Sequence, residues 1–157
     1  MSKLKFTTQN TNSKLLITLS GQIDETFPPE LMDISPAAEV VIDLDQIKLI
    51  NSLGIREWIK FVNHLSQAKT IEFVKCPKIF IDQVNMVQGF IGSNCKVMSF
   101  YVPYFNEDND VEKNILFTFG QEYGDGFLNV EPEIKLPDGT QMEIDVVEQK
   151  YFKFLKN

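Results

Sequence analysis

The chain has 157 residues, a net charge of −7 and two cysteines. This length is enough for one domain with a substantial apolar core, or for one domain with a small appendage. Cys76 and Cys95 are too few and too unpatterned for a disulfide scaffold or a cysteine-based metal or redox motif. The sequence shows no apolar signal-peptide core and no apolar run as long as a membrane span, so we expect a cytoplasmic protein without membrane insertion.

The acidic excess is confined to the C-terminal third. Residues 1–100 contain as many basic as acidic residues, so residues 101–157 hold the whole net charge. Such a step in composition indicates a second structural unit. We place the boundary after Pro103, with one unit over residues 1–103 and an acidic, β-rich extension over residues 104–157. An acidic surface repels a phosphate backbone, so nucleic acid is not an expected partner.

The first part of the chain predicts strands. Alternating apolar residues predict two antiparallel strands over residues 4–6 and 15–19, joined by a hairpin turn. Flanking prolines leave room for one helical turn at residues 30–34. The short, β-branched segment VVIDL at residues 40–44 predicts a strand that is buried on both faces.

The next segment has the strongest helical pattern in the chain. Over residues 52–66, apolar side chains recur at spacings of three and four, and polar side chains occupy the other face; the apolar positions are Ile55, Trp58, Val62 and Leu65. Strands are predicted at residues 70–74 and 96–102, with a second helix over residues 78–89 between them. The order β-β-β-α-β-α-β predicts an α/β fold, in which helices pack on a mixed sheet.

The C-terminal extension has a different pattern. An acidic connector is followed by a predicted strand over residues 115–119, a glycine-rich loop at 123–126 and a turn at 137–139. The last piece alternates apolar and polar residues over 142–146 and ends in an aromatic run at 151–154. These features predict a small β-rich unit.

Asn51, Ser52, Leu53 and Gly54 stand between the buried strand and the first long helix. The first N–H groups of a helix lack partners within the helix, and the helix dipole favours negative charge there. A phosphate on Ser52 would therefore be stabilised at this position. The alternative is that Ser52 or Asn51 only caps the helix.

The element order and the Asn51-Ser52-Leu53-Gly54 turn resemble the STAS domain, the fold of bacterial anti-sigma factor antagonists and of sulfate-transporter cytoplasmic tails. The resemblance covers about residues 3–102. The family signature at this turn is Asp-Ser-x-Gly, in which a partner kinase phosphorylates the serine and the loop docks on that partner. The resemblance implies that Ser52 is the phosphoacceptor and Gly54 the signature glycine, while Asn51 replaces the aspartate.

The extension resembles a zinc ribbon whose metal ligands have been replaced. Asn106 and Asn109 match the first Cys-x-x-Cys knuckle, and Lys135 and Asp138 match the second. Structural zinc takes thiolate or imidazole ligands, so the resemblance implies a metal-free, degenerate ribbon. Packing of aromatic side chains would then hold it together, namely Phe117, Phe119, Phe127, Tyr151, Phe152 and Phe154. An ordinary β-rich extension is the open alternative.

Other polar residues form no recognised catalytic or metal-binding motif. The acidic connector alternates oxygen ligands as a calcium loop does, but Val111 and Phe117 stand where an EF-hand needs glycine and glutamate. His64 has no evident nucleophile or ligand partner. Asp43 and Asp45 follow the buried strand, where they either form a polar site near the helix entrance or satisfy backbone donors.

These patterns predict a non-enzymatic bacterial regulatory or adaptor protein. We expect it to bind a protein partner, a kinase or a regulator, through residues 51–54, with phosphorylation of Ser52 as a candidate control. The alternative is a small-ligand or ion-binding sensor that uses a cleft between the two units or the acidic connector. We expect no catalytic residues, no metal and no cofactor, and the sequence does not define the oligomeric state.

Overall fold

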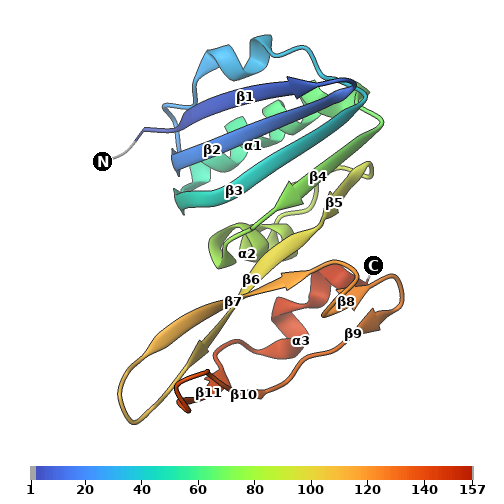
Figure 1. The fold of residues 1–157 in the computed structure, drawn as a ribbon. Helices are drawn as coiled ribbons and strands as arrows, with labels where there is room; N and C mark the ends of the chain where they lie inside the picture. The colour runs from blue at the N-terminus through green and yellow to red at the C-terminus, as the bar shows by residue number, and fades with distance from the viewer. Residues whose placement is uncertain (1–2, 157) are drawn as a thin grey trace.

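The computed structural model describes residues 3–156, which form two main sheets, one above the other in Figure 1. The first sheet has five strands in the spatial order β1-β2-β3-β4-β5: β1 (Lys5–Thr11), β2 (Lys14–Ile23), β3 (Glu39–Ile50), β4 (Thr70–Val74) and β5 (Cys95–Val97). β1 is antiparallel to β2, and the remaining neighbours are parallel. The predicted mixed sheet and α/β character are confirmed.

Helices connect the parallel strands of this sheet. The connections are η1 (Pro29–Asp33) before β3, α1 (Ser52–His64) continued by η2 (Leu65–Gln67) before β4, and α2 (Lys78–Met86) before β5. Both predicted long helices are present. α2 ends three residues before the predicted limit of residue 89, because Val87 is extended and Gly89 has a φ of 84°. Glycine adopts that left-handed conformation at no steric cost.

Trp58 is the centre of the core beneath the first sheet. Its ring is fully buried and lies 5.4 to 5.8 Å, between centroids, from four phenylalanine rings, those of Phe61, Phe73, Phe80 and Phe90. The indole Nε1 donates a hydrogen bond to the Phe90 carbonyl at 3.0 Å. This one side chain therefore ties α1 to β4, to α2 and to the loop after α2, and its polar atom is not left unpaired.

The strand predicted over residues 96–102 is two strands. β5 ends at Val97, β6 (Ser99–Phe105) begins two residues later, and they belong to different sheets. Between them, the Met98 N–H donates to the Phe73 carbonyl at 2.8 Å, and the Met98 carbonyl accepts from the Phe119 N–H at 2.9 Å. Val97 at the end of β5 and most of β6 are buried, so the apolar pattern continues across the break and conceals it.

The second sheet has the order β10-β11-β6-β7. Besides β6 it contains β7 (Glu112–Thr118), β10 (Glu133–Lys135) and β11 (Gln141–Ile144). A small separate hairpin pairs β8 (Tyr123–Gly124) with β9 (Phe127–Leu128). The described chain ends with α3 (Glu148–Tyr151) and η3 (Lys153–Lys156). The boundary placed after Pro103 lies inside β6. The division of the chain into separately folding units there stays a prediction.

Phe100 is the centre of the second core. Its buried ring lies 5.1 to 6.1 Å, between centroids, from five other aromatic rings, those of Phe117, Tyr123, Tyr151, Phe152 and Phe154. Most of the aromatic residues expected to hold the extension do pack here. Phe119 packs at the edge of this core, 5.7 Å from the Tyr123 ring between centroids, and Phe127 is 43% exposed on the β8–β9 hairpin.

Asn85 joins α2 to the end of the chain. Its Nδ2 donates to the Tyr151 carbonyl at 2.9 Å, and its Oδ1 accepts from the Phe154 N–H at 2.9 Å. Both backbone groups lie beside the aromatic cluster, where an unpaired polar group costs free energy. The C-terminal elements are thus fixed to the first unit by a neutral side chain as well as by apolar packing.

We predict that Asn85→Ala lowers the free energy of unfolding by about 1–3 kcal/mol, because it leaves two partly buried backbone groups without partners. Urea denaturation measures the change. Asn63→Ala is the matched control, since Asn63 is an exposed residue of α1 and alanine is a better helix former. Equal stability of Asn85→Ala and the wild-type protein would show that this side chain does not hold the two units together.

Candidate functional site

Asn51 caps the helix at the predicted site. Its backbone is extended, its Oδ1 accepts from the Gly54 N–H at 2.8 Å, and its own N–H donates to the Ile23 carbonyl at 3.1 Å. One of the free N–H groups of the first helical turn is satisfied in this way. The end of β3 and the start of α1 are therefore held against the end of β2.

Gly54 lies directly on the backbone of β2. A Cβ at this position would lie 1.9 Å from the Ile23 carbonyl oxygen and 2.7 Å from the Asp24 nitrogen. Its φ is not in the left-handed region, so the requirement for glycine comes from this close approach and not from the conformation of the turn. The helix entrance has almost no freedom to move toward the sheet.

The loop after β2 forms the other side of the site. Asp24 is buried, and its Oδ1 accepts from the N–H and the hydroxyl of Thr26, at 2.8 and 2.5 Å. The exposed Glu25 accepts a hydrogen bond from Asn51 Nδ2 at 3.0 Å. Glu25 was not predicted from the sequence; it lies here because β2 and β3 are parallel, which brings the ends of both strands to one edge of the sheet.

Two exposed side chains stand on this rigid frame. Ser52, the first residue of α1, is exposed, and the Leu53 side chain is 51% exposed. Leu49, near the end of β3, is 44% exposed. The four predicted residues thus divide into two that fix the backbone, Asn51 and Gly54, and two that face solvent.

Asp43 and Asp45 do not belong to this site. Asp45 lies five residues before the end of β3, on the order of 15 Å along an extended strand. Its Oδ1 accepts a hydrogen bond from the Tyr101 hydroxyl at 2.5 Å, and its N–H donates to Asp43 Oδ1 at 3.0 Å. Asp43 thus satisfies a backbone donor, which is one of the two alternatives for these residues. The other alternative, a polar site near the helix entrance, is excluded because β3 continues for several residues beyond the aspartates.

The hydrogen bond between Tyr101 and Asp45 changes the pKa of both side chains. The Tyr101 hydrogen bond holds the pKa of Asp45 below its usual value. Burial and the Asp45 carboxylate raise the pKa of Tyr101 to about 12. The pair lines a groove of about 460 Å³ between β3, the start of α2 and β6.

The proposed zinc-knuckle positions are held by hydrogen bonds. Asn106 Oδ1 accepts from the Asp108 and Asn109 N–H groups at 2.8 and 3.1 Å, and its Nδ2 donates to the Gln141 carbonyl at 2.6 Å. In the turn between β10 and β11, Asp138 Oδ1 accepts from the Thr140 N–H at 2.9 Å, and Lys135 is exposed. Over residues 3–156, no group of three or more His, Cys, Asp or Glu side chains is placed to hold a metal ion.

The remaining candidate residues form no reactive centre. His64 is half-buried, and its Nε2 lies 2.7 Å from the Ile34 carbonyl, so the ring joins α1 to the segment after η1. Burial raises the pKa of the Cys76 thiol well above its ordinary value and that of Cys95 to about 11. Both thiols are therefore neutral at physiological pH and are poor nucleophiles.

No protein-family model matches the sequence, and no curated protein matches it either. Among solved structures, the chain is similar to an anti-sigma factor antagonist from Mycobacterium paratuberculosis. The two share 18% sequence identity with a TM-score of 0.39, over 47% of this chain and 68% of that chain. A likeness at this level does not determine function. Within the described residues, no helix is long and apolar enough to cross a membrane.

We predict that Gly54→Ala destabilises the protein by about 1–3 kcal/mol or more, because its methyl group would overlap the β2 backbone. Helix propensity alone predicts that Gly54→Ala would stabilise the protein, since alanine normally stabilises a helix interior relative to glycine. Gly92→Ala is the control, as a Cβ there would meet only the Asn94 and Cys95 side chains, at 3.3 and 3.8 Å. A thermal melt in which Gly54→Ala matches or exceeds the wild type would contradict the close contact.

We predict that Tyr101→Phe costs about 1 kcal/mol at neutral pH and that this cost shrinks in acid. The pKa of Asp45 is lower in the folded state than in the unfolded state, where it is about 3.9. The hydrogen bond from Tyr101 therefore stabilises the fold fully at pH values above the unfolded-state pKa. This stabilisation is lost as the pH falls through the folded-state pKa of Asp45. Tyr104→Phe is the control, because Tyr104 donates to the Glu131 carbonyl, which does not titrate. Urea melts from pH 7 to about pH 3 should show a pH-dependent difference only for Tyr101→Phe.

Proposed function

We propose that this protein is a non-enzymatic bacterial regulatory or adaptor protein that binds a protein partner through the helix entrance around Ser52. The observation that carries the proposal is the contrast at this entrance. Its backbone is fixed by Asn51 and Gly54, while Leu53 presents half of its side-chain surface to solvent. A rigid backbone lowers the entropy lost on association, and an exposed leucine offers apolar area to bury.

The docking surface consists of Glu25, Leu49, Ser52 and Leu53. Glu25 and Ser52 bring polar groups to this edge, and the two leucines bring apolar surface. A partner that fits has apolar pockets for the leucines and a hydrogen-bond donor or cation for the free oxygen of Glu25. A protein surface, such as that of a kinase or a regulator, can offer both features, whereas the backbone of a nucleic acid is anionic.

The STAS resemblance supports the same edge as a docking site. The element order over the first sheet and the Asn51-Ser52-Leu53-Gly54 turn carry that resemblance. We propose Ser52 as a phosphoacceptor because its hydroxyl is exposed at a helix N-terminus. The added phosphate would bring further negative charge to the surface that carries Glu25, so phosphorylation would alter the charge of that surface and weaken docking.

A non-enzymatic role, and cytoplasmic location, are parts of this proposal. The carboxylate at the helix entrance, Glu25, is bound by Asn51 and has no hydrogen bond to the Ser52 hydroxyl among the contacts of the described residues, so it is not placed to activate that serine. The second candidate function is a small-ligand sensor. It is favoured by the cavity that Lys96 lines, at the junction of the two units.

We predict that a photo-crosslinking amino acid in place of Leu53 captures a protein partner, and that the same crosslinking amino acid in place of Met86 does not capture it. Met86 is the matched position, because its side chain is also apolar and is 70% exposed, at the end of α2. The captured partner is then titrated against the wild type, Ser52→Asp and Ser52→Ala. We expect Ser52→Asp to weaken binding about tenfold, since the new charge must be desolvated at the interface, and Ser52→Ala to change it less.

All three proteins should unfold at nearly the same denaturant concentration, because a carboxylate at the first turn of a helix is well tolerated. Equal affinities for all three would remove Ser52 from the interface and leave it as an ordinary helix residue. Mass spectrometry of the protein from its native cells, examined at Ser52, tests phosphorylation separately.

A further inference from the structure

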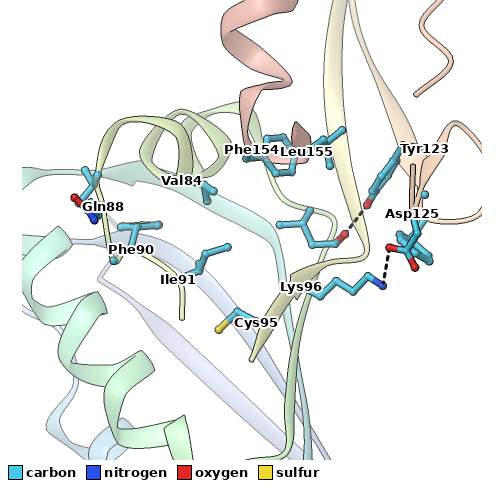
Figure 2. A pocket seen from close by; sticks show the side chains of 15 residues that line it. Val84, Gln88, Phe90, Ile91, Cys95, Lys96, Tyr123, Asp125, Phe154 and Leu155 are labelled. Carbon is cyan, nitrogen blue, oxygen red and sulfur yellow. Dashed lines mark hydrogen bonds and ion pairs between the residues drawn. The ribbon is translucent and has the colours of Figure 1, made fainter. Parts of the chain in front are cut away.

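A cavity of about 430 Å³ opens where the first sheet meets the C-terminal elements (Figure 2). Its walls come from the end of α2 and the following loop, from β5, from the turn after β7 and from η3. Its volume is within the range of small-molecule sites, about 300–1,000 Å³. The surface docking site proposed above shares none of its residues.

Part of the wall is apolar. Val84, Phe90 and Ile91 stand on one side, and Phe154 and Leu155 on another, as Figure 2 shows. Phe90 belongs to the buried aromatic core, so the wall behind it is rigid. These side chains would surround the apolar part of a ligand.

Among the described residues that line the cavity, Lys96 has the only cationic side chain. Its Nζ lies 3.8 Å from the centre of the Phe119 ring, which positions the ammonium group by a cation–π contact without using a carboxylate. Asp125 is 3.9 Å away, but its side chain is 91% exposed, so this ion pair is screened by water and easily exchanged. The ammonium group keeps N–H donors for a ligand.

The other polar groups of the lining point to binding and not to chemistry. The Tyr123 hydroxyl donates to the Val97 carbonyl at 2.6 Å and is thereby occupied. Burial keeps the Cys95 thiol neutral by raising its pKa to about 11, and its sulfur accepts from the Gly92 N–H. Neither group is an available nucleophile or base.

We propose that this cavity binds a small amphipathic anion, a carboxylate on an apolar chain or ring, with its head on Lys96 and its body between Ile91 and Phe154. The proposal does not depend on the partner-binding role of Ser52. The walls come from both parts of the chain, so the ligand stabilises their junction by mass action.

The test titrates the full-length protein with decanoate and with 1-decanol, which has the same chain without the charge. Saturable binding is followed by amide chemical shifts. We expect decanoate to bind about tenfold more tightly, because a charge-assisted hydrogen bond is added to the same apolar contact. Lys96→Gln should remove that preference and leave decanol binding unchanged, and Lys60→Gln, an exposed lysine of α1, is the matched control.

Ile91→Trp provides an independent variant, since the larger ring would fill the cavity from a half-buried position. It should weaken both compounds, and a thermal melt verifies that it is folded. Shifts centred on the cavity residues and abolished by Ile91→Trp support the proposal. The proposal would be overturned if binding were not saturable, if the shifts lay elsewhere on the surface, or if Lys96→Gln bound decanoate as tightly as the wild type does. If Ile91→Trp fails to fold, the location of the chemical-shift changes in the wild-type protein decides between these outcomes.

Discussion

The passage of the main chain from β5 to β6 is the constraint on which the rest of the structure depends. Met98 donates its N–H to Phe73 in the first sheet and accepts the N–H of Phe119 at the end of β7, so its backbone is paired in two directions. Two residues later, Phe100 enters the second aromatic core. No flexible linker separates the sheets, and moving one relative to the other would break backbone hydrogen bonds in a largely buried region. The cavity lined by Lys96 exists because the chain passes between the sheets at this point.

The helix entrance is fixed by a different device. Hydrogen bonds of Asn51 and the contact of Gly54 with Ile23 fix the backbone, while Ser52 and Leu53 contribute nothing to the core. A site of this kind can change its exposed side chains at little cost in stability. Folding therefore depends on the two outer residues of this turn, Asn51 and Gly54, and the proposed recognition on the two inner residues, Ser52 and Leu53.

Periodicity located most of the first sheet and both long helices, because strands and helices with one buried face leave a regular pattern. The predicted strand at residues 70–74 agrees with β4. The break at Met98 left no signal, since the residues on either side of it, Val97 and Ser99, are both buried and the apolar pattern runs on into β6. The Tyr101–Asp45 bond and the Glu25–Asn51 bond join residues 56 and 26 positions apart, so only three-dimensional register brings them together. Neither could be derived from local spacing.

Three asparagines join separate segments, and each uses both ends of its amide. Asn51 binds Gly54 and Glu25, Asn85 binds Phe154 and Tyr151, and Asn106 binds its own turn and Gln141. An aspartate accepts hydrogen bonds but donates none when ionised, so it could form only half of each pair. At residue 51 it would also place a second carboxylate against Glu25, where like charges repel. Asn51 therefore makes two contacts that an ionised aspartate could not make together, and it holds the negative charge of Glu25 at the helix entrance.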